Sequence, residues 1–186
     1  MILTTDRLLL RDFVESDWEA VLTYQKDPLY LRYNEWTSRT DEEVRQFTQM
    51  FLDYQKQIPR IKFQFAVTLK STGQLIGNCG VRRNSPETRE GDIGYELDPN
   101  FWGNGYATEA ARAVLGYGFS DMHLQRVSAW CIAENVASAR VLEKLGMRLE
   151  RQAKNHQYFK GRWWDTLSYI ISYDEWQIQR RNGKSI

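Results

Sequence analysis

Residues 93–110 read IGYELDPNFWGNGYATEA, and this stretch predicts a strand, a sharp turn and a helix in immediate succession. The strand stops at Asp98-Pro99, and a run typical of a helix begins at Tyr106. Gly103 and Gly105 lie in the turn, where glycine lets the main chain approach a ligand without a Cβ in the way. Because the first N–H groups of a helix lack partners and carry partial positive charge, the stretch predicts an anion site that suits a pyrophosphate.

The glycine-rich turn by itself does not identify its ligand. A Rossmann site needs a third glycine or an alanine where this chain has Thr108, and a Walker loop needs a Gly-Lys-Ser/Thr sequence that is missing. A tight turn without a ligand therefore stays open as an alternative. Lys and Arg are missing from residues 98–111, so we expect backbone dipoles rather than cations to meet the charge of the anion.

Alternating apolar residues and helix-start signals divide the rest of the chain into short elements. The expected strands cover residues 7–13, 63–69, 75–81, 92–97, 126–132 and two stretches of 149–173 joined at Lys160-Gly161. The expected helices start at Ser16-Asp17, at the capping box of Thr40 and Glu43, at Tyr106 and at Asn135. We therefore predict one α+β domain over residues 1–186, with a mostly antiparallel mixed sheet of about seven strands and about four flanking helices.

Composition and charge exclude several classes of protein. The 186 residues are 42% apolar and 26% charged, and the net charge of +1 provides no strong field for nucleic acid. No stretch approaches the roughly 20 apolar residues of a membrane helix, and no signal peptide is recognisable, so we expect a cytoplasmic protein without membrane contact. Cys79 and Cys131 lie in apolar, strand-like surroundings, which predicts buried reduced thiols rather than a disulfide or a metal site.

Residues 93–110 closely resemble the acetyl-CoA motif of the GNAT superfamily of N-acetyltransferases. More narrowly, the motif resembles that of the RimJ/RimL-like branch (the ribosomal-protein-alanine acetyltransferase type), in which a tryptophan precedes the first glycine. Further matches are NVASARVLEKLGM at residues 135–147, where the family has Asn-x-x-Ser, and TDRLLLR at residues 5–11. The resemblance extends from residue 4 to about residue 173, and it implies a GNAT-like fold whose sheet is splayed at its central parallel pair.

The resemblance also implies roles for individual residues. The main chain from Tyr95 to Leu97 should bond the pantetheine arm and the thioester of acetyl-CoA, with the Leu97 amide as the donor to the developing oxyanion. Asn135 carries a donor and an acceptor for the pantetheine amides, and Ser138 should donate a hydrogen bond to the leaving thiolate. The loop amides that should hold the pyrophosphate belong to Trp102, Gly103, Asn104, Gly105, Tyr106, Ala107 and Thr108.

The general base and the acceptor site stay open at this point. Glu96 could take the amine proton, or it could be an ion-paired or solvated carboxylate. RimL-like proteins have a proposed base late in the chain, where this sequence has Gln157, and the adjacent His156 is a further candidate. Residues 28–36 join the two early helices, a region that commonly borders the acceptor site in the superfamily, and their aromatic side chains could line a pocket or cover the core.

The sequence therefore predicts an acetyl-CoA-dependent N-acetyltransferase in which a primary amine attacks the thioester directly. Both the α-amine of a protein N-terminus and a small-molecule amine fit as acceptors. The alternative is a non-catalytic acyl-CoA-binding sensor with the same fold, although retention of both glycines, Asn135 and Ser138 favours the enzyme. A monomer and a homodimer are both compatible with the sequence.

Overall fold

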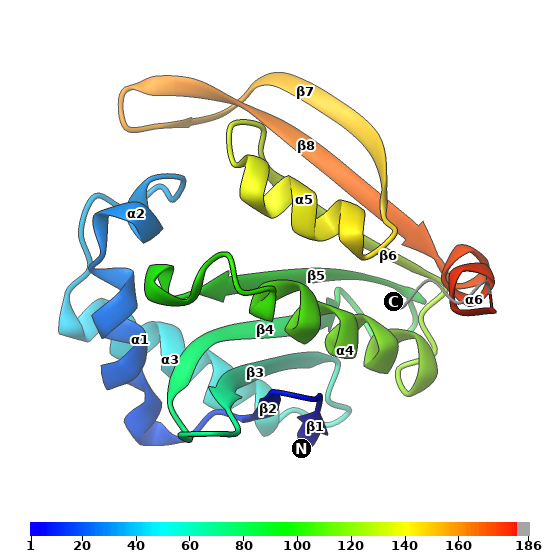
Figure 1. The fold of residues 1–186 in the computed structure, drawn as a ribbon, viewed down its shortest axis with the longest axis horizontal. Coiled ribbons are helices and arrows are strands. Elements are labelled where there is room, and N and C mark those ends of the chain that lie inside the picture. Colours follow the sequence, from blue (N-terminus) through cyan, green and yellow to red (C-terminus); the bar gives the residue numbers. More distant parts are fainter. Residues whose placement is uncertain (182–186) are drawn as a thin grey trace.

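One mixed β-sheet, with eight strands among residues 1–181, forms the centre of the fold (Figure 1). The structure, a computed structural model, describes residues 1–181. Its strands are β1 (Ile2–Thr4), β2 (Leu8–Asp12), β3 (Lys62–Leu69), β4 (Leu75–Arg83), β5 (Glu90–Leu97), β6 (Arg126–Ile132), β7 (Arg148–Phe159) and β8 (Arg162–Ser172). Their order in the sheet is β1-β2-β3-β4-β5-β6-β8-β7, and every neighbouring pair is antiparallel except β5 with β6.

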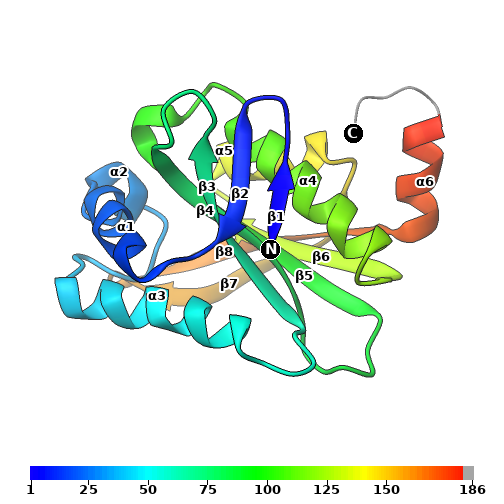
Figure 2. The ribbon, with the colours of Figure 1, turned by 90° about the horizontal axis from the view of Figure 1, so that it is seen from below.

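Helices cover both faces of this sheet (Figure 2). They are α1 (Trp18–Gln25), α2 (Pro28–Leu31), α3 (Asp41–Gln55), α4 (Tyr106–Ser120), α5 (Val136–Lys144) and α6 (Tyr173–Arg181), with short 3₁₀ turns η1 (Glu15–Asp17) and η2 (Pro99–Phe101). Helix α3 lies on one face together with α1, whereas α4 and α5 lie on the other. This sandwich follows from strand geometry, because successive side chains of a strand point to opposite faces and each face needs cover.

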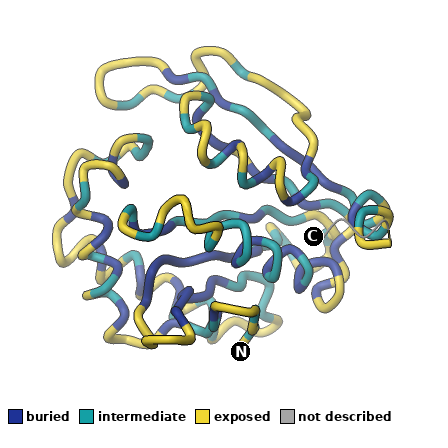
Figure 3. The backbone as a smooth tube through the Cα atoms, viewed as in Figure 1, coloured by how far each residue is buried: buried dark blue, intermediate teal, exposed yellow. Residues whose placement is uncertain are grey.

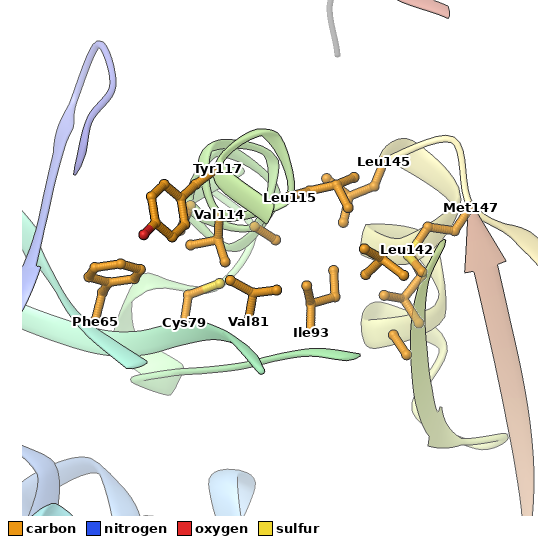
Figure 4. Close-up of a cluster of buried hydrophobic side chains, with 14 of the residues drawn as sticks. Phe65, Cys79, Val81, Ile93, Val114, Leu115, Tyr117, Leu142, Leu145 and Met147 are labelled. Carbon is orange, nitrogen blue, oxygen red and sulfur yellow. The ribbon is translucent and has the colours of Figure 1, made fainter. Parts of the chain in front are cut away.

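The two faces of the sheet support two apolar cores. The larger core packs strand residues such as Phe65, Val81 and Ile93 against α4 and α5 (Figure 4). The smaller core joins α1 and α3 to the other face through residues such as Tyr24 and Phe51. The face toward α1 and α3 is therefore where the polar side chains of β4 and β5 meet the aromatic residues of the first helices.

The sheet opens between β5 and β6. Their parallel pairing extends only from Glu90↔Arg126 to Asp92↔Ser128. Beyond this point β5 stays paired with β4 as far as Leu97, while β6 stays paired with β8 as far as Ile132. The predicted splay at the central parallel pair is thereby confirmed, and it leaves the end of β5 without a neighbour on one side.

The predicted α+β architecture is confirmed, and the structure adds β1, α2 and α6 to the expected elements. The antiparallel hairpin of β3 and β4 is present, as is the capping box, in which the Glu43 carboxylate accepts from the Thr40 amide at 2.7 Å. Helix α2 escaped detection because Asp27-Pro28 reads as the end of a helix. Here the same dipeptide also starts one, since Asp27 Oδ1 accepts from the Leu29 amide at 2.7 Å.

The two cysteines are free and buried, as the sequence predicted. Burial raises the pKa of the Cys79 thiol to about 12 and that of Cys131 to about 11, so both stay protonated near neutral pH. Among the helices of residues 1–181, none combines the length and the apolar character needed to cross a membrane.

Candidate active site

A cleft of about 550 Å³ lies where β5 and β6 diverge. It brings together the end of β5, the loop before α4, the start of α5 and the short helix α2. Of the residues that the sequence singled out, the cleft is lined by Glu96, Leu97, Trp102, Gly103, Gly105, Tyr106, Ala107, Thr108, Asn135 and Ser138. Asn104 is missing from this lining, because its side chain points back to the Phe101 and Trp102 carbonyls at 3.2 and 3.1 Å.

The loop before α4 has the conformation that its glycines permit. Gly103 and Gly105 have φ of +78° and +80°, a region where a side chain is strained. Gly105 is the N-cap of α4, and no side chain caps this helix end. The first backbone N–H groups of α4 are therefore available to an anion, and the loop itself is exposed (Figure 3).

Arg7, from the connection between β1 and β2, fixes this loop from outside the cleft. Its guanidinium donates to Glu109 Oε2 at 2.7 Å and to the Asn104 carbonyl at 3.0 Å, and it lies 4.4 Å from the centre of the Tyr106 ring. Thr5 also donates to the Glu109 carboxylate, at 2.5 Å. Sequence reasoning assigned Arg7 no role in the site, and the separation of 102 residues between Arg7 and Glu109 explains why.

The backbone of Leu97 points into the opening of the sheet. The Asp98 amide donates to the Ile76 carbonyl at 2.8 Å, and antiparallel ladders alternate bonded with non-bonded pairs. The pair Leu97↔Gly77 is therefore non-bonded, so the Leu97 N–H and C=O face away from β4, toward the gap before β6. The Trp102 indole donates to the Leu97 carbonyl at 2.8 Å, which leaves the Leu97 N–H as the group directed at the cleft.

Ser138 is held by residues from two different elements. Asn135 caps α5, with its Oδ1 accepting from the Ser138 amide at 3.1 Å, so this oxygen of Asn135 already has a partner. On β5, the Tyr95 hydroxyl lies 3.0 Å from Ser138 Oγ and 3.0 Å from the Ser138 carbonyl oxygen. Burial raises the pKa of Tyr95, so its hydroxyl keeps its proton and can donate to Ser138. Sequence reasoning considered only the backbone of Tyr95, whereas its side chain supports the serine.

Glu96 accepts four hydrogen bonds from side chains of α1, α2 and β4. Oε1 accepts from the Tyr24 hydroxyl at 2.6 Å, from Gln25 Nε2 at 3.0 Å and from Asn78 Nδ2. Oε2 accepts from the Tyr30 hydroxyl at 2.5 Å. Glu96 is thus neither freely solvated nor directly ion-paired within residues 1–181, which corrects both structural alternatives that the sequence left open.

The two tyrosines at Glu96 remain hydrogen-bond donors across the physiological range. Burial raises the pKa of Tyr24 and Tyr30 well above the usual tyrosine value, and the negative charge of Glu96 raises both further. Tyr30 lines the cleft, whereas Tyr24 lies behind the carboxylate in the smaller core. The cleft therefore presents the Oε2 side of Glu96 together with one tyrosine.

The other base candidates lie apart from the cleft. His156 is exposed on β7, where its Nδ1 lies 2.9 Å from Thr166 Oγ1, and it does not line the cleft. Gln157 lies on β7, which β6 and β8 separate from β5; it pairs with Trp164 of β8 and is likewise missing from the lining. The residues that the structure describes include no cluster of three or more His, Cys, Asp or Glu side chains suited to a metal ion.

The turn of the β7–β8 hairpin extends toward α2 (Figure 1), and it contacts this helix at one end of the cleft. Lys160, at the hairpin turn, donates to the Leu31 carbonyl at 2.6 Å, and the Tyr33 ring meets Trp164 edge-on at 6.0 Å. Tyr33 also donates to the Glu134 carbonyl at 3.0 Å, just before α5. The segment 28–36 thus borders the cleft with Leu29, Tyr30, Tyr33 and Asn34, as the family resemblance implied.

Two cations of α5 also line the cleft. Arg140 and Lys144 lie four residues apart on the helix, so they share one face of it. The expectation that dipoles rather than cations would meet the charge of an anion considered only residues 98–111, and these two cations are further candidates for that role. The spacing of these residues on the expected helix was the signal that could have identified them.

Comparisons with known proteins agree with this geometry. Residues 7–148 match the family described as an acetyltransferase (GNAT) domain. The chain is 36% identical over 176 residues to the uncharacterized N-acetyltransferase YnaD of Bacillus subtilis (strain 168), covering 95% of this chain and 99% of that protein. It is also similar to a solved acetyltransferase (GNAT family) from Bacillus anthracis, with 34% identity, a TM-score of 0.81 and coverage of 94% and 99% of the two chains.

The fold is shared more widely than the sequence. The structure of RimL, a ribosomal L7/L12 alpha-N-protein acetyltransferase solved in complex with coenzyme A, matches with a TM-score of 0.81 at 22% identity. This match covers 94% of the present chain and 99% of that chain. At this level of identity, the match establishes the common architecture.

Proposed function

The chain belongs to the GNAT acetyltransferase family and is an acetyltransferase, and from this premise we propose that it transfers the acetyl group of acetyl-CoA to a primary amine in the β5–β6 cleft. The observation that carries the proposal is the meeting of an uncapped helix start, a free Leu97 amide and the Glu96 carboxylate in one cleft. A glycine turn without a ligand would require neither the free Leu97 amide nor the Glu96 carboxylate beside it.

The donor side of the site consists of Leu97, residues 102–108, Asn135 and Ser138. The N–H groups at the start of α4 fit the two phosphates of the pyrophosphate, and Arg140 and Lys144 add positive charge near them. Asn104 supports the loop through its side-chain bonds rather than by facing the cleft. Because Asn135 Oδ1 already accepts from the Ser138 amide, Asn135 Nδ2 is our candidate donor to the pantetheine arm.

On the acceptor side, Glu96 and Tyr30 line the cleft, and the buried side chains of Tyr24, Gln25 and Asn78 hold Glu96 from behind. As the amine nitrogen forms its bond to the acetyl carbon, Glu96 takes the proton that this nitrogen loses. The Leu97 amide donates to the carbonyl oxygen while negative charge develops there. The bond between carbon and sulfur then breaks, and the Ser138 hydroxyl donates to the departing sulfur.

An amine panel tests the proposed reaction. Release of free CoA is measured with peptides that carry free α-amines, with polyamines and with aminoglycosides, and mass spectrometry identifies the acetylated product. We expect stoichiometric CoA and acetyl-amine with at least one class. A protein N-terminus as the preferred acceptor would extend the similarity to RimL-type enzymes, and a polyamine or aminoglycoside would assign a small-molecule acceptor.

Acetyl-CoA binding without turnover across the whole panel would contradict the transfer reaction and support the acyl-CoA sensor instead. Sedimentation of the protein with and without acetyl-CoA distinguishes a monomer from a homodimer, both of which the single-domain fold allows.

A further inference from the structure

Two chains of side-chain amides lead away from Glu96, and each ends at an arginine. The first is short: Gln25 donates from Nε2 to Glu96 Oε1 at 3.0 Å, and its Oε1 accepts from Arg39 Nε at 3.0 Å. Gln25 is completely buried, and Arg39 is 7% exposed. Because Arg39 can only donate, it fixes which end of the Gln25 amide faces Glu96.

The second chain crosses the face of the sheet that looks toward α1 and α3. Asn78 donates from Nδ2 to Glu96 Oε1, while its Oδ1 accepts from Gln64 Nε2 at 2.6 Å. Gln64 Oε1 in turn accepts from Arg82 Nη1 at 3.4 Å, and Arg82 pairs with Asp92. Asn78 and Gln64 are each 3% exposed, so water cannot replace these contacts at little cost.

These chains treat the two oxygens of Glu96 differently. Oε1 accepts three hydrogen bonds, from Tyr24, Gln25 and Asn78, so both of its lone pairs are fully engaged. Among the described residues, Oε2 accepts one, from Tyr30 at the cleft wall. Both amide chains present an N–H to Glu96 and a carbonyl oxygen toward an arginine, so each arginine fixes which end of the amides faces the carboxylate.

We propose that Gln25 and Asn78 are positioning residues, which hold Oε1 of Glu96 and leave Oε2 as the oxygen that receives the amine proton. Arg39 orients Gln25, and Arg82 orients Asn78 through Gln64; these two amide chains are called the relays below. This inference rests on the proposed function, since it assigns a role in that reaction to residues outside the cleft. Neither Gln25 nor Asn78 lines the cleft, so neither can contact the amine or acetyl-CoA.

Two near-isosteric substitutions test the relays. Gln25→Glu keeps an oxygen toward Arg39 and Asn78→Asp keeps an oxygen toward Gln64, but each replaces the N–H that faces Glu96 by an oxygen. The titratable and charged groups around Glu96 are Tyr24 and Tyr30, with Arg39, Arg82 and Asp92 beyond the relays. Because each variant loses a donor to Oε1 and gains a negative charge beside it, the acidic limb of kcat/KM should move to higher pH.

The expected result is about a 10-fold loss of kcat/KM on the acidic limb, recovery as the pH rises, and an unchanged Kd for acetyl-CoA. The matched control is Gln55→Glu, which makes the same substitution in α3, where Gln55 bonds the Phe13 carbonyl at 3.0 Å. Its pH profile should equal that of the wild type. A loss of activity that is equal at every pH in both relay variants would indicate a merely structural role and overturn the proposal.

A second readout does not depend on turnover. The titration of the Glu96 carboxyl carbon is followed by ¹³C NMR and assigned by comparison with Glu96→Gln, and both relay variants should displace it to higher pH. An unmoved titration would overturn the relays even if the enzyme is active. If no amine is acetylated by the wild type, the proposed function fails, yet the NMR titration still decides whether these amides govern Glu96.

Discussion

The two sides of the cleft depend on different kinds of chemical group. The donor side depends mostly on backbone groups: the N–H groups that start α4, the Leu97 amide and the conformation that two glycines allow. The acceptor side depends on buried side chains, because Glu96 is held by four of them from three elements. Donor binding should therefore tolerate most side-chain changes on the acceptor side, and the chemistry should be sensitive to them.

The largest effect is expected at Glu96, where a substitution should lower turnover without changing acetyl-CoA binding. Glu96→Gln keeps the shape of the residue but cannot take a proton, and losing a general base commonly costs roughly 10²–10⁴-fold in turnover. We expect kcat to fall by that factor, while calorimetry finds the Kd of acetyl-CoA unchanged. Activity retained by Glu96→Gln, together with an alkaline pH optimum, would mean that the amine loses its proton to solvent.

At Gly105 we expect the opposite, namely weaker acetyl-CoA binding from a change on the donor side. An alanine at its φ of +80° is strained by about 1–2 kcal/mol, so Gly105→Ala should weaken acetyl-CoA binding by about 10-fold. Gly73→Ala is the matched control, since Gly73 has a φ of +74° in a turn with open space around it. Denaturant unfolding should give similar losses of stability for both variants. Weakened binding in both would show that the effect is one of global stability and not of the loop.

An effect of similar size, but on turnover, is expected where the two sides meet, at Ser138. Ser138→Ala removes a hydrogen bond to a developing thiolate and should lower kcat by about 10-fold with little change in acetyl-CoA affinity. Tyr95→Phe removes the hydroxyl that lies 3.0 Å from Ser138 Oγ and should have a weaker effect in the same direction. The double variant should be no worse than Ser138→Ala, because both changes act through one group. Fully additive losses would contradict this coupling.

The last effect concerns folding rather than turnover, namely the stability of the acceptor side at high pH. The pKa values of Tyr24 and Tyr30 are raised in the folded chain by burial and by Glu96, so their protonated forms stabilise the fold below about pH 10. Above that pH the unfolded chain loses these protons and the folded chain keeps them, so stability falls by about 1.4 kcal/mol per pH unit for each tyrosine.

Urea unfolding between pH 9 and pH 11 measures this slope. Tyr24→Phe and Tyr30→Phe should each make it shallower, whereas Tyr158→Phe, at an exposed position on β7, should leave it unchanged. An identical slope in all variants would contradict the protonated, buried state of the two tyrosines.

The same contrast explains what the sequence could predict. The donor loop was predictable because its signals are local: Gly103, Gly105 and the start of α4 lie within a few residues of each other. Asn135 and Ser138 share one cap for the same reason. The strands other than β1 were predictable from alternation, whereas the short helix α2 was not, since its four residues provide too little periodicity.

The acceptor side was unreadable because its contacts are distant in sequence. Tyr24, Gln25 and Tyr30 lie 66 to 72 residues before Glu96 in the sequence, and no sequence pattern near Glu96 predicts these contacts. Arg7 supports the donor loop from a similar distance and was missed for the same reason. Glu96 was therefore a candidate by type and position, and only the fold surrounds it with its partners.

The structure of the chain in complex with acetyl-CoA tests the central claim most directly, because it locates the donor relative to the two sides. We expect the pyrophosphate at the N–H groups of residues 103–108, the thioester oxygen at about 3 Å from the Leu97 amide, and the sulfur next to Ser138. Glu96 should face the acetyl carbon from the opposite wall. Acetyl-CoA bound away from the β5–β6 opening, or with its thioester out of reach of Leu97, would contradict the assignment of this cleft as the active site.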